Sequence, residues 1–112
     1  MLLQRSDSIA ANAYNPNVLS GQQFEFAPQN VFLELGTLAA ATGVQVSLTT
    51  GKDVVCIDQL VNLVRIAGQG PQYPDDYLIN DVVGMGQRII VAYRNTQSSP
   101  IIVFTSLKLT PI

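Results

Sequence analysis

The 112-residue chain contains no histidine and no tryptophan, and its only cysteine is Cys56. Without histidine, the chain lacks the usual base of serine and cysteine hydrolases and the commonest side-chain ligand of zinc. A lone cysteine excludes an intrachain disulfide. Cys56 lies within the apolar run 54–57, which is typical of a small buried hydrophobic residue. These absences predict a protein that is not an enzyme and that has no cofactor.

Charged side chains are also scarce. They make up 12% of the chain, against about 25% in ordinary soluble domains, and the formal net charge is −2. The six basic residues are scattered along the sequence, so no direct nucleic-acid binding is expected. A polar surface built from Asn, Gln, Ser and Thr suits a free monomer poorly, but it suits a subunit whose surface is covered in an assembly.

Long apolar runs are missing as well, although the mean hydropathy is +0.25. Glu34, Gly36, Asp58 and Arg65 interrupt the apolar stretches, and none reaches the roughly 18 to 20 residues of a membrane-spanning helix. The N-terminal residues MLLQRSDS lack the apolar centre of a signal peptide. The sequence therefore predicts no membrane span, no signal peptide and synthesis in the cytoplasm.

The apolar residues that are present follow strand patterns. Residues 44–50 alternate apolar and polar side chains, and a turn at 50–53 leads into a second apolar run at 54–57. Residues 38–42 are Ala-rich and allow a helical turn as an alternative, whereas 58–67 fit a helix or a strand. Further strand patterns lie at 24–26, 31–35, 77–79 and twice within 87–110. About seven or eight short strands separated by turn signals predict an all-β protein, an antiparallel β-sandwich or barrel.

The first 21 residues show turn signals at 15–17 and 20–21 and no continuous strand pattern. They predict an extended N-terminal arm over residues 1–21, followed by a single β-sandwich domain over 22–112. Scattered apolar side chains allow this arm to dock on its own domain or on a neighbour. Four of them are candidates for an assembly surface: Leu2, Leu3, Ile9 and Tyr14.

The stretch QRIIVAYRNTQSSPIIVFTSLKL, residues 87–109, has the pattern of two strands around a polar turn. The side chains that point outward are identified from Arg88, Arg94 and Lys108, because charged side chains point away from a core. The outward face then carries the other candidates for an assembly surface: Ile90, Ala92, Ile102 and Phe104. Such a patch is too large to leave in water. Three covers fit the sequence, namely the N-terminal arm, the segment 58–67, or another subunit.

The polar loop region and its flank hold the remaining chemical candidates. Asp75, Asp76 and Asp81 either supply oxygen ligands to calcium or bond to nearby backbone amides in turns. Tyr73 and Tyr77 are candidate loop contacts. Their rings either stack on a sugar or a protein partner, or they pin the loop to its own domain.

The arm, the weakly charged sandwich and three segments together resemble the small jelly-roll capsid, vertex and decoration proteins of bacteriophages. The segments are VVCI at 54–57, the long loop at 68–76 and the closing RIIVAYRNTQSSPIIVFTSLKL. The resemblance implies a jelly-roll-like β-sandwich and a non-enzymatic structural protein located in a virion, whose partners are copies of itself, a major shell protein, or both. It carries over no functional residue. The alternative function is a β-sandwich module that binds carbohydrate, or that binds its ligand through calcium.

Overall fold

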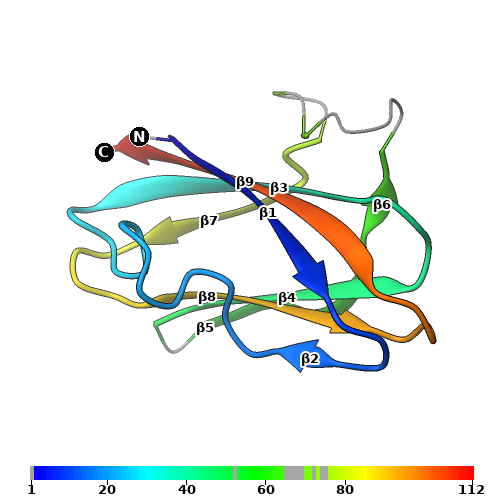
Figure 1. The fold of residues 1–112 in the computed structure, drawn as a ribbon. Coiled ribbons are helices and arrows are strands. Elements are labelled where there is room, and N and C mark those ends of the chain that lie inside the picture. Colours follow the sequence, from blue (N-terminus) through cyan, green and yellow to red (C-terminus); the bar gives the residue numbers. More distant parts are fainter. Residues whose placement is uncertain (1, 52, 65–69, 72, 74–75) are drawn as a thin grey trace.

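The computed structural model describes residues 2–51, 53–64, 70–71, 73 and 76–112, and all their regular structure is β-strand. Two sheets pack face to face around one core (Figure 1). The predicted all-β sandwich is therefore confirmed. The strands are β1 (Leu2–Ile9), β2 (Tyr14–Asn15), β3 (Val31–Ala39), β4 (Val44–Thr50), β5 (Asp53–Leu60), β6 (Asn62–Leu63), β7 (Ile79–Val83), β8 (Ile89–Asn95) and β9 (Ile101–Pro111).

Sheet A has the order β1-β9-β3, with β6 and β7 both pairing β3, and sheet B has the order β2-β8-β4-β5. Apart from the short β6, the strands pair antiparallel from the outside of the sequence inwards: β1 with β9, β2 with β8, β3 with β7, and β4 with β5. In the folded domain these strand pairs also lie next to one another, with β9 beside β3 and β8 beside β4. This strand order is jelly-roll-like.

Period-2 alternation explains which side chains form the core. In β4, Val44, Val46 and Leu48 are buried, while the intervening polar residues are partly exposed. The same pattern in β3 and β9 buries one apolar row of each strand, because successive side chains point to opposite faces of a sheet. The two inner rows meet between the sheets and form the core cluster.

The segment predicted as an arm belongs to the sandwich instead. All eight residues of β1 pair with β9, and Leu3 and Ile9 pack against the core. The pattern is hidden in the sequence because the inward positions between them are charged. The Arg5 guanidinium binds the Asp7 carboxylate at 2.6 Å, so both charges are satisfied at the border of the sandwich. Because β1 lies within 1–21, the domain does not begin at residue 22.

The rest of the predicted arm lies along the outer edge of β8. Leu19 and Val18 are buried in the core, and the Val18 amide donates to the Val91 carbonyl at 2.9 Å. The Asn17 side-chain oxygen accepts from the Val91 amide at 3.1 Å, in the manner of a neighbouring strand. Further along, Phe26 forms an isolated bridge with Arg88, where a strand over 24–26 was expected.

The predicted hairpin over 87–109 is wrong. Strand β8 lies in sheet B and β9 in sheet A, so residues 96–100 cross from one sheet to the other (Figure 1). Asn95 is buried at the crossing, where its side-chain amide donates to the carbonyls of Ile9 at 3.0 Å and Ser99 at 2.8 Å. The predicted phase is nevertheless observed in β8, where Ile89, Val91 and Tyr93 are buried and Arg94 is exposed.

Smaller differences concern the segments whose type was uncertain. Strand β3 continues to Ala39, so the alternative of a helical turn beginning at residue 38 is wrong. Residues 58–60 end β5 and 62–63 form β6, so this part of 58–67 is strand, whereas 65–67 and the turn residue Lys52 lie outside the described residues. Within the described part of the chain, no helix has the length and apolar character needed to cross a membrane.

Candidate functional site

The outer face of sheet A is partly covered by the loop that precedes β7. Gly36 provides the space, because a Cβ at this position would lie 2.9 Å from Pro71 Cβ and 3.1 Å from Tyr77 Cδ1. Tyr77 is only 8% exposed, and its hydroxyl hydrogen-bonds with Ser106 Oγ of β9. The cover of this face is thus part of the same chain.

The two predicted loop contacts differ in accessibility. Tyr77 is buried as described, whereas Tyr73 is 52% exposed. The Lys108 ammonium lies 3.7 Å from the Tyr73 ring centroid, and the Tyr73 and Tyr77 rings meet edge to face at 5.1 Å. These contacts pin the described part of the loop to sheet A. They leave less aromatic surface for stacking on a sugar.

The carboxylates proposed for calcium do not converge in the described residues. Asp81 Oδ2 accepts a hydrogen bond from Thr50 Oγ1 at 2.6 Å, which ties β7 to the end of β4. Asp76 is buried, and Asp75 lies outside the described residues. Across the described ranges, no group of three or more Asp, Glu, Cys or His side chains is arranged to hold a metal ion.

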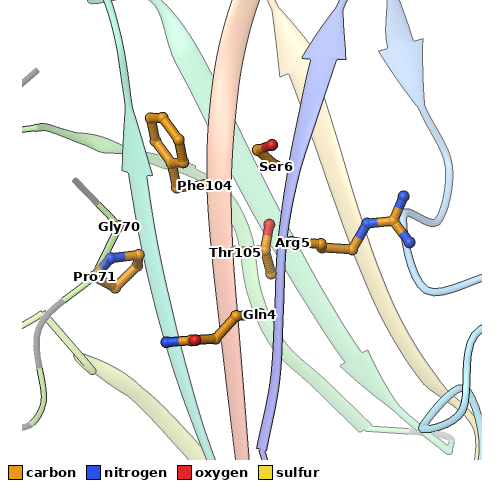
Figure 2. A pocket seen from close by; sticks show the side chains of 7 residues that line it. All are labelled: Gln4, Arg5, Ser6, Gly70, Pro71, Phe104 and Thr105. Atoms are coloured by element: carbon orange, nitrogen blue, oxygen red, sulfur yellow. The ribbon is translucent and has the colours of Figure 1, made fainter. Parts of the chain in front are cut away.

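A shallow groove of about 310 Å³ lies on the outer face of sheet A (Figure 2). Its lining residues are Gln4, Arg5, Ser6, Gly70, Pro71, Phe104 and Thr105. The Arg5 side chain points away from the groove toward Asp7, which raises the pKa of Arg5 through their hydrogen bond (Figure 2). The remaining lining is neutral, with the Phe104 and Pro71 rings beside the Gln4 amide and the Ser6 hydroxyl. The groove therefore offers van der Waals contact and hydrogen bonds but no acid–base pair.

The outer face of sheet B is built differently, because β5 carries two bulges. The pairing of β5 with β4 shifts register between Val46 and Leu48 and again between Leu48 and Thr49. Residues 57 and 58 consequently both lie opposite the outward-facing Ser47, and 55 and 56 both lie opposite the inward-facing Leu48. Asp58 has the positive φ of 50° and donates its amide to Ser47 Oγ at 2.9 Å.

These bulges bring apolar side chains spaced by three residues onto one side of the sheet. Val54 is 58% exposed, Ile57 68% and Leu60 65%, whereas Val55 and Cys56 pack against the core. Burial raises the pKa of the Cys56 thiol, so the thiol stays protonated at neutral pH. We define the sheet B face as Val54, Ile57 and Leu60 of β5, Gln45, Ser47 and Thr49 of β4, and Ile90 and Ala92 of β8.

The charges that border the sheet B face are paired within the chain. At one end Arg94 lies 3.9 Å from Asp58, and its guanidinium stacks over the Tyr14 ring at 4.8 Å. At the other end Arg88 binds Glu25 at 2.9 Å. Asp58 lies beside Ile57, opposite Ser47, so its pair with Arg94 crosses the face over β4. The charges of each pair cancel, and the face has no net charge.

The predicted assembly residues are divided among three places. Ile90 and Ala92 lie on the sheet B side with Tyr14 at its border, but Ile90 is only partly exposed and Ala92 is buried, at 3% exposure. Ile102, Phe104 and Leu2 lie on the outer face of sheet A, on the opposite side of the molecule, because β8 and β9 are in different sheets. Leu3 and Ile9 point inward. Sequence reasoning missed Val54, Ile57 and Leu60, whose three-residue spacing in an apolar strand is the available signal for bulges.

Comparison with known proteins adds no family or relative. No family model matches the chain, and neither does any curated protein or solved structure. The functional proposal therefore depends on the chain's own surface.

Proposed function

We propose that this chain is a non-enzymatic structural protein of a virion, a capsid, vertex or decoration subunit that assembles through subunit–subunit contacts. The supporting observation is that large apolar side chains are exposed on several sides of the sandwich rather than in one ligand site. Among the described residues they are Leu2, Tyr14, Phe26, Val54, Ile57, Leu60, Leu63, Tyr73, Leu78, Val82, Met85, Ile102 and Ile112.

The distribution of these side chains supports contacts with more than one neighbour. Ile102 lies on the outer face of sheet A, and Ile57 lies on the outer face of sheet B. Leu78 lies just before the edge strand β7, and Val82 lies within it. A subunit inside a shell has neighbours in several directions, and each large apolar side chain that a neighbour buries stabilises the contact by roughly 1.5–3 kcal/mol.

The low charge supports the same proposal. A shell subunit repeats the same contact many times, and a net charge of −2 produces little repulsion between copies. The ligand-binding alternative has weaker support, because Tyr77 is buried and the groove beside Phe104 is shallow. Its remaining candidate is a small neutral group, such as a sugar, in that groove.

Sedimentation velocity of the purified full chain, from micromolar to millimolar concentration, tests the proposal. We expect the weight-average sedimentation coefficient to rise with concentration, and electron microscopy of the most concentrated sample to show oligomers or particles. A single monomeric species at every concentration would contradict the proposal. Titration with simple sugars and with calcium, followed by thermal melting, tests the alternative in the same material.

A further inference from the structure

The geometry points to the sheet B face as a self-packing surface whose occupant is the same face of a second copy of this chain. The inference rests on the proposed structural function and specifies its contact. Two copies related by a two-fold axis would stack sheet B on sheet B, as the two sheets of a sandwich stack within one domain.

The contrast between the two outer faces supports this assignment. The chain covers part of sheet A itself, with Pro71 and Tyr77 packed over Gly36. On sheet B, Ile57 at the centre of the β5 row remains 68% exposed. The bulges of β5 place this side chain on the same side as Val54 and Leu60, where uninterrupted strand alternation would turn it toward the opposite side.

Charge complementarity favours a second copy as the occupant. The charges on and beside the face form the internal pairs Asp58–Arg94 and Glu25–Arg88, so an identical surface can meet it without bringing unpaired like charges together. A nucleic acid or a strongly charged protein would find no unpaired countercharge on the face. The mode is face-to-face packing and not extension of the sheet, since the bulges interrupt the regular hydrogen-bond ladder at the β5 edge.

The size of the face sets the strength of the contact. Strands β4 and β8 have seven residues each, which at about 3.3 Å per residue gives a length of about 23 Å. Three strands about 4.8 Å apart, with their side chains, give a width of about 15 to 18 Å. Two copies would bury about 700 to 800 Å² in total, which is below the roughly 1,200 Å² of stable specific interfaces and corresponds to weak, transient association. Such a contact dissociates in dilute solution and becomes effective when several contacts act together.

Sedimentation equilibrium of the full chain, up to millimolar concentration, compares the wild type with Ile57→Lys and with Asn80→Lys. Ile57→Lys places a charge at the centre of the face, on an exposed edge-strand position that contributes little to the core. Asn80→Lys adds the same charge on β7 at an exposed position on sheet A and serves as the matched control. Leu60→Lys is the second test variant, and circular dichroism melting verifies that each variant is folded.

We expect Ile57→Lys and Leu60→Lys to weaken self-association at least about tenfold, since each copy loses a buried apolar contact and gains an opposed charge. Asn80→Lys should associate as the wild type does. Association of both folded sheet B variants with wild-type affinity would overturn the inference while leaving the proposed function intact. A wild type that stays monomeric at every concentration would overturn both. Equal weakening by Asn80→Lys would mean that the effect is not specific to the sheet B face and would also overturn the inference.

Discussion

The hydrogen bond between Tyr93 and Thr105 links the two sheets inside the core, and its removal has a calculable effect. Tyr93 belongs to β8 and Thr105 to β9, and their hydroxyl oxygens lie 2.7 Å apart. Tyr93 is 0% exposed and Thr105 is 2% exposed, so water cannot replace a lost partner. We therefore expect a double-mutant cycle over Tyr93→Phe and Thr105→Val to show strong coupling.

Each single substitution leaves one buried hydroxyl without its partner. Such a group costs about 1–3 kcal/mol, so each variant should lose that amount of unfolding free energy. For a domain of this size, the melting temperature should fall by about 4 °C for each kcal/mol. The double variant removes both hydroxyls and leaves no unsatisfied partner. Its free energy of unfolding should be no lower than that of the less stable single variant.

Urea denaturation followed by far-ultraviolet circular dichroism measures the four free energies, and the common slope of the transitions verifies two-state unfolding. The expected coupling between the two positions is about 1–2 kcal/mol. Additive effects, with a coupling below about 0.5 kcal/mol, would refute the reasoning, because they would mean that the two hydroxyls do not depend on each other.

Three further outcomes follow from named contacts. Gly36→Ala should destabilise the domain by about 1–3 kcal/mol in the same denaturation assay, because the new Cβ would lie 2.9 Å from Pro71 Cβ, whereas Gly70→Ala, which meets nothing within 4 Å, should not. Asn95→Ala should lower the unfolding free energy by about 2–4 kcal/mol, since the side chain bonds the Ile9 and Ser99 carbonyls, and an effect below 1 kcal/mol would contradict its role at the crossing. Burial raises the pKa of Tyr93 above its usual value of 10.0, so above pH 10 the unfolded chain releases a proton that the folded chain keeps. Stability should then fall by about 1.4 kcal/mol per pH unit, a contribution that Tyr93→Phe should lack.

The in–out pattern of individual strands could be predicted from the sequence. The alternation in residues 44–50 and the positions of Arg88 and Arg94 are local signals, and burial of a charge is costly enough to fix the phase of a strand. The choice of sheet for each strand is not local. A hairpin and a crossing connection between β8 and β9 leave the same residues inward, so the pattern alone cannot separate them. One signal favoured the crossing: residues 96–100 contain no glycine, which tight hairpin turns commonly require.

Two other features of the structure lay beyond pattern reasoning for different physical reasons. Strand β1 is difficult to recognise because Arg5 and Asp7 occupy inward positions, and their mutual ion pair replaces the apolar side chains that a pattern search expects. The row formed by Val54, Ile57 and Leu60 depends on two bulges in β5, and a bulge displaces every later side chain to the other face. The pairing with β4 determines where the bulges fall, so the sheet B face could not be recovered from β5 alone.

The edge strands β1 and β5, and the outer side of β8, differ in how they are protected from pairing with another chain, and β7 forms a further edge. Residues 14–27 lie along β8 and occupy its hydrogen-bonding groups, from Val91 to the bridge at Arg88. Strand β1 carries the inward-pointing Arg5–Asp7 pair, and β5 is interrupted by bulges, which are two known means of preventing strand addition. At β1, β5 and β8, this protection favours contacts between copies through exposed apolar side chains over a continued sheet. Such contacts are limited in area and therefore reversible, which is consistent with the assembly function proposed above.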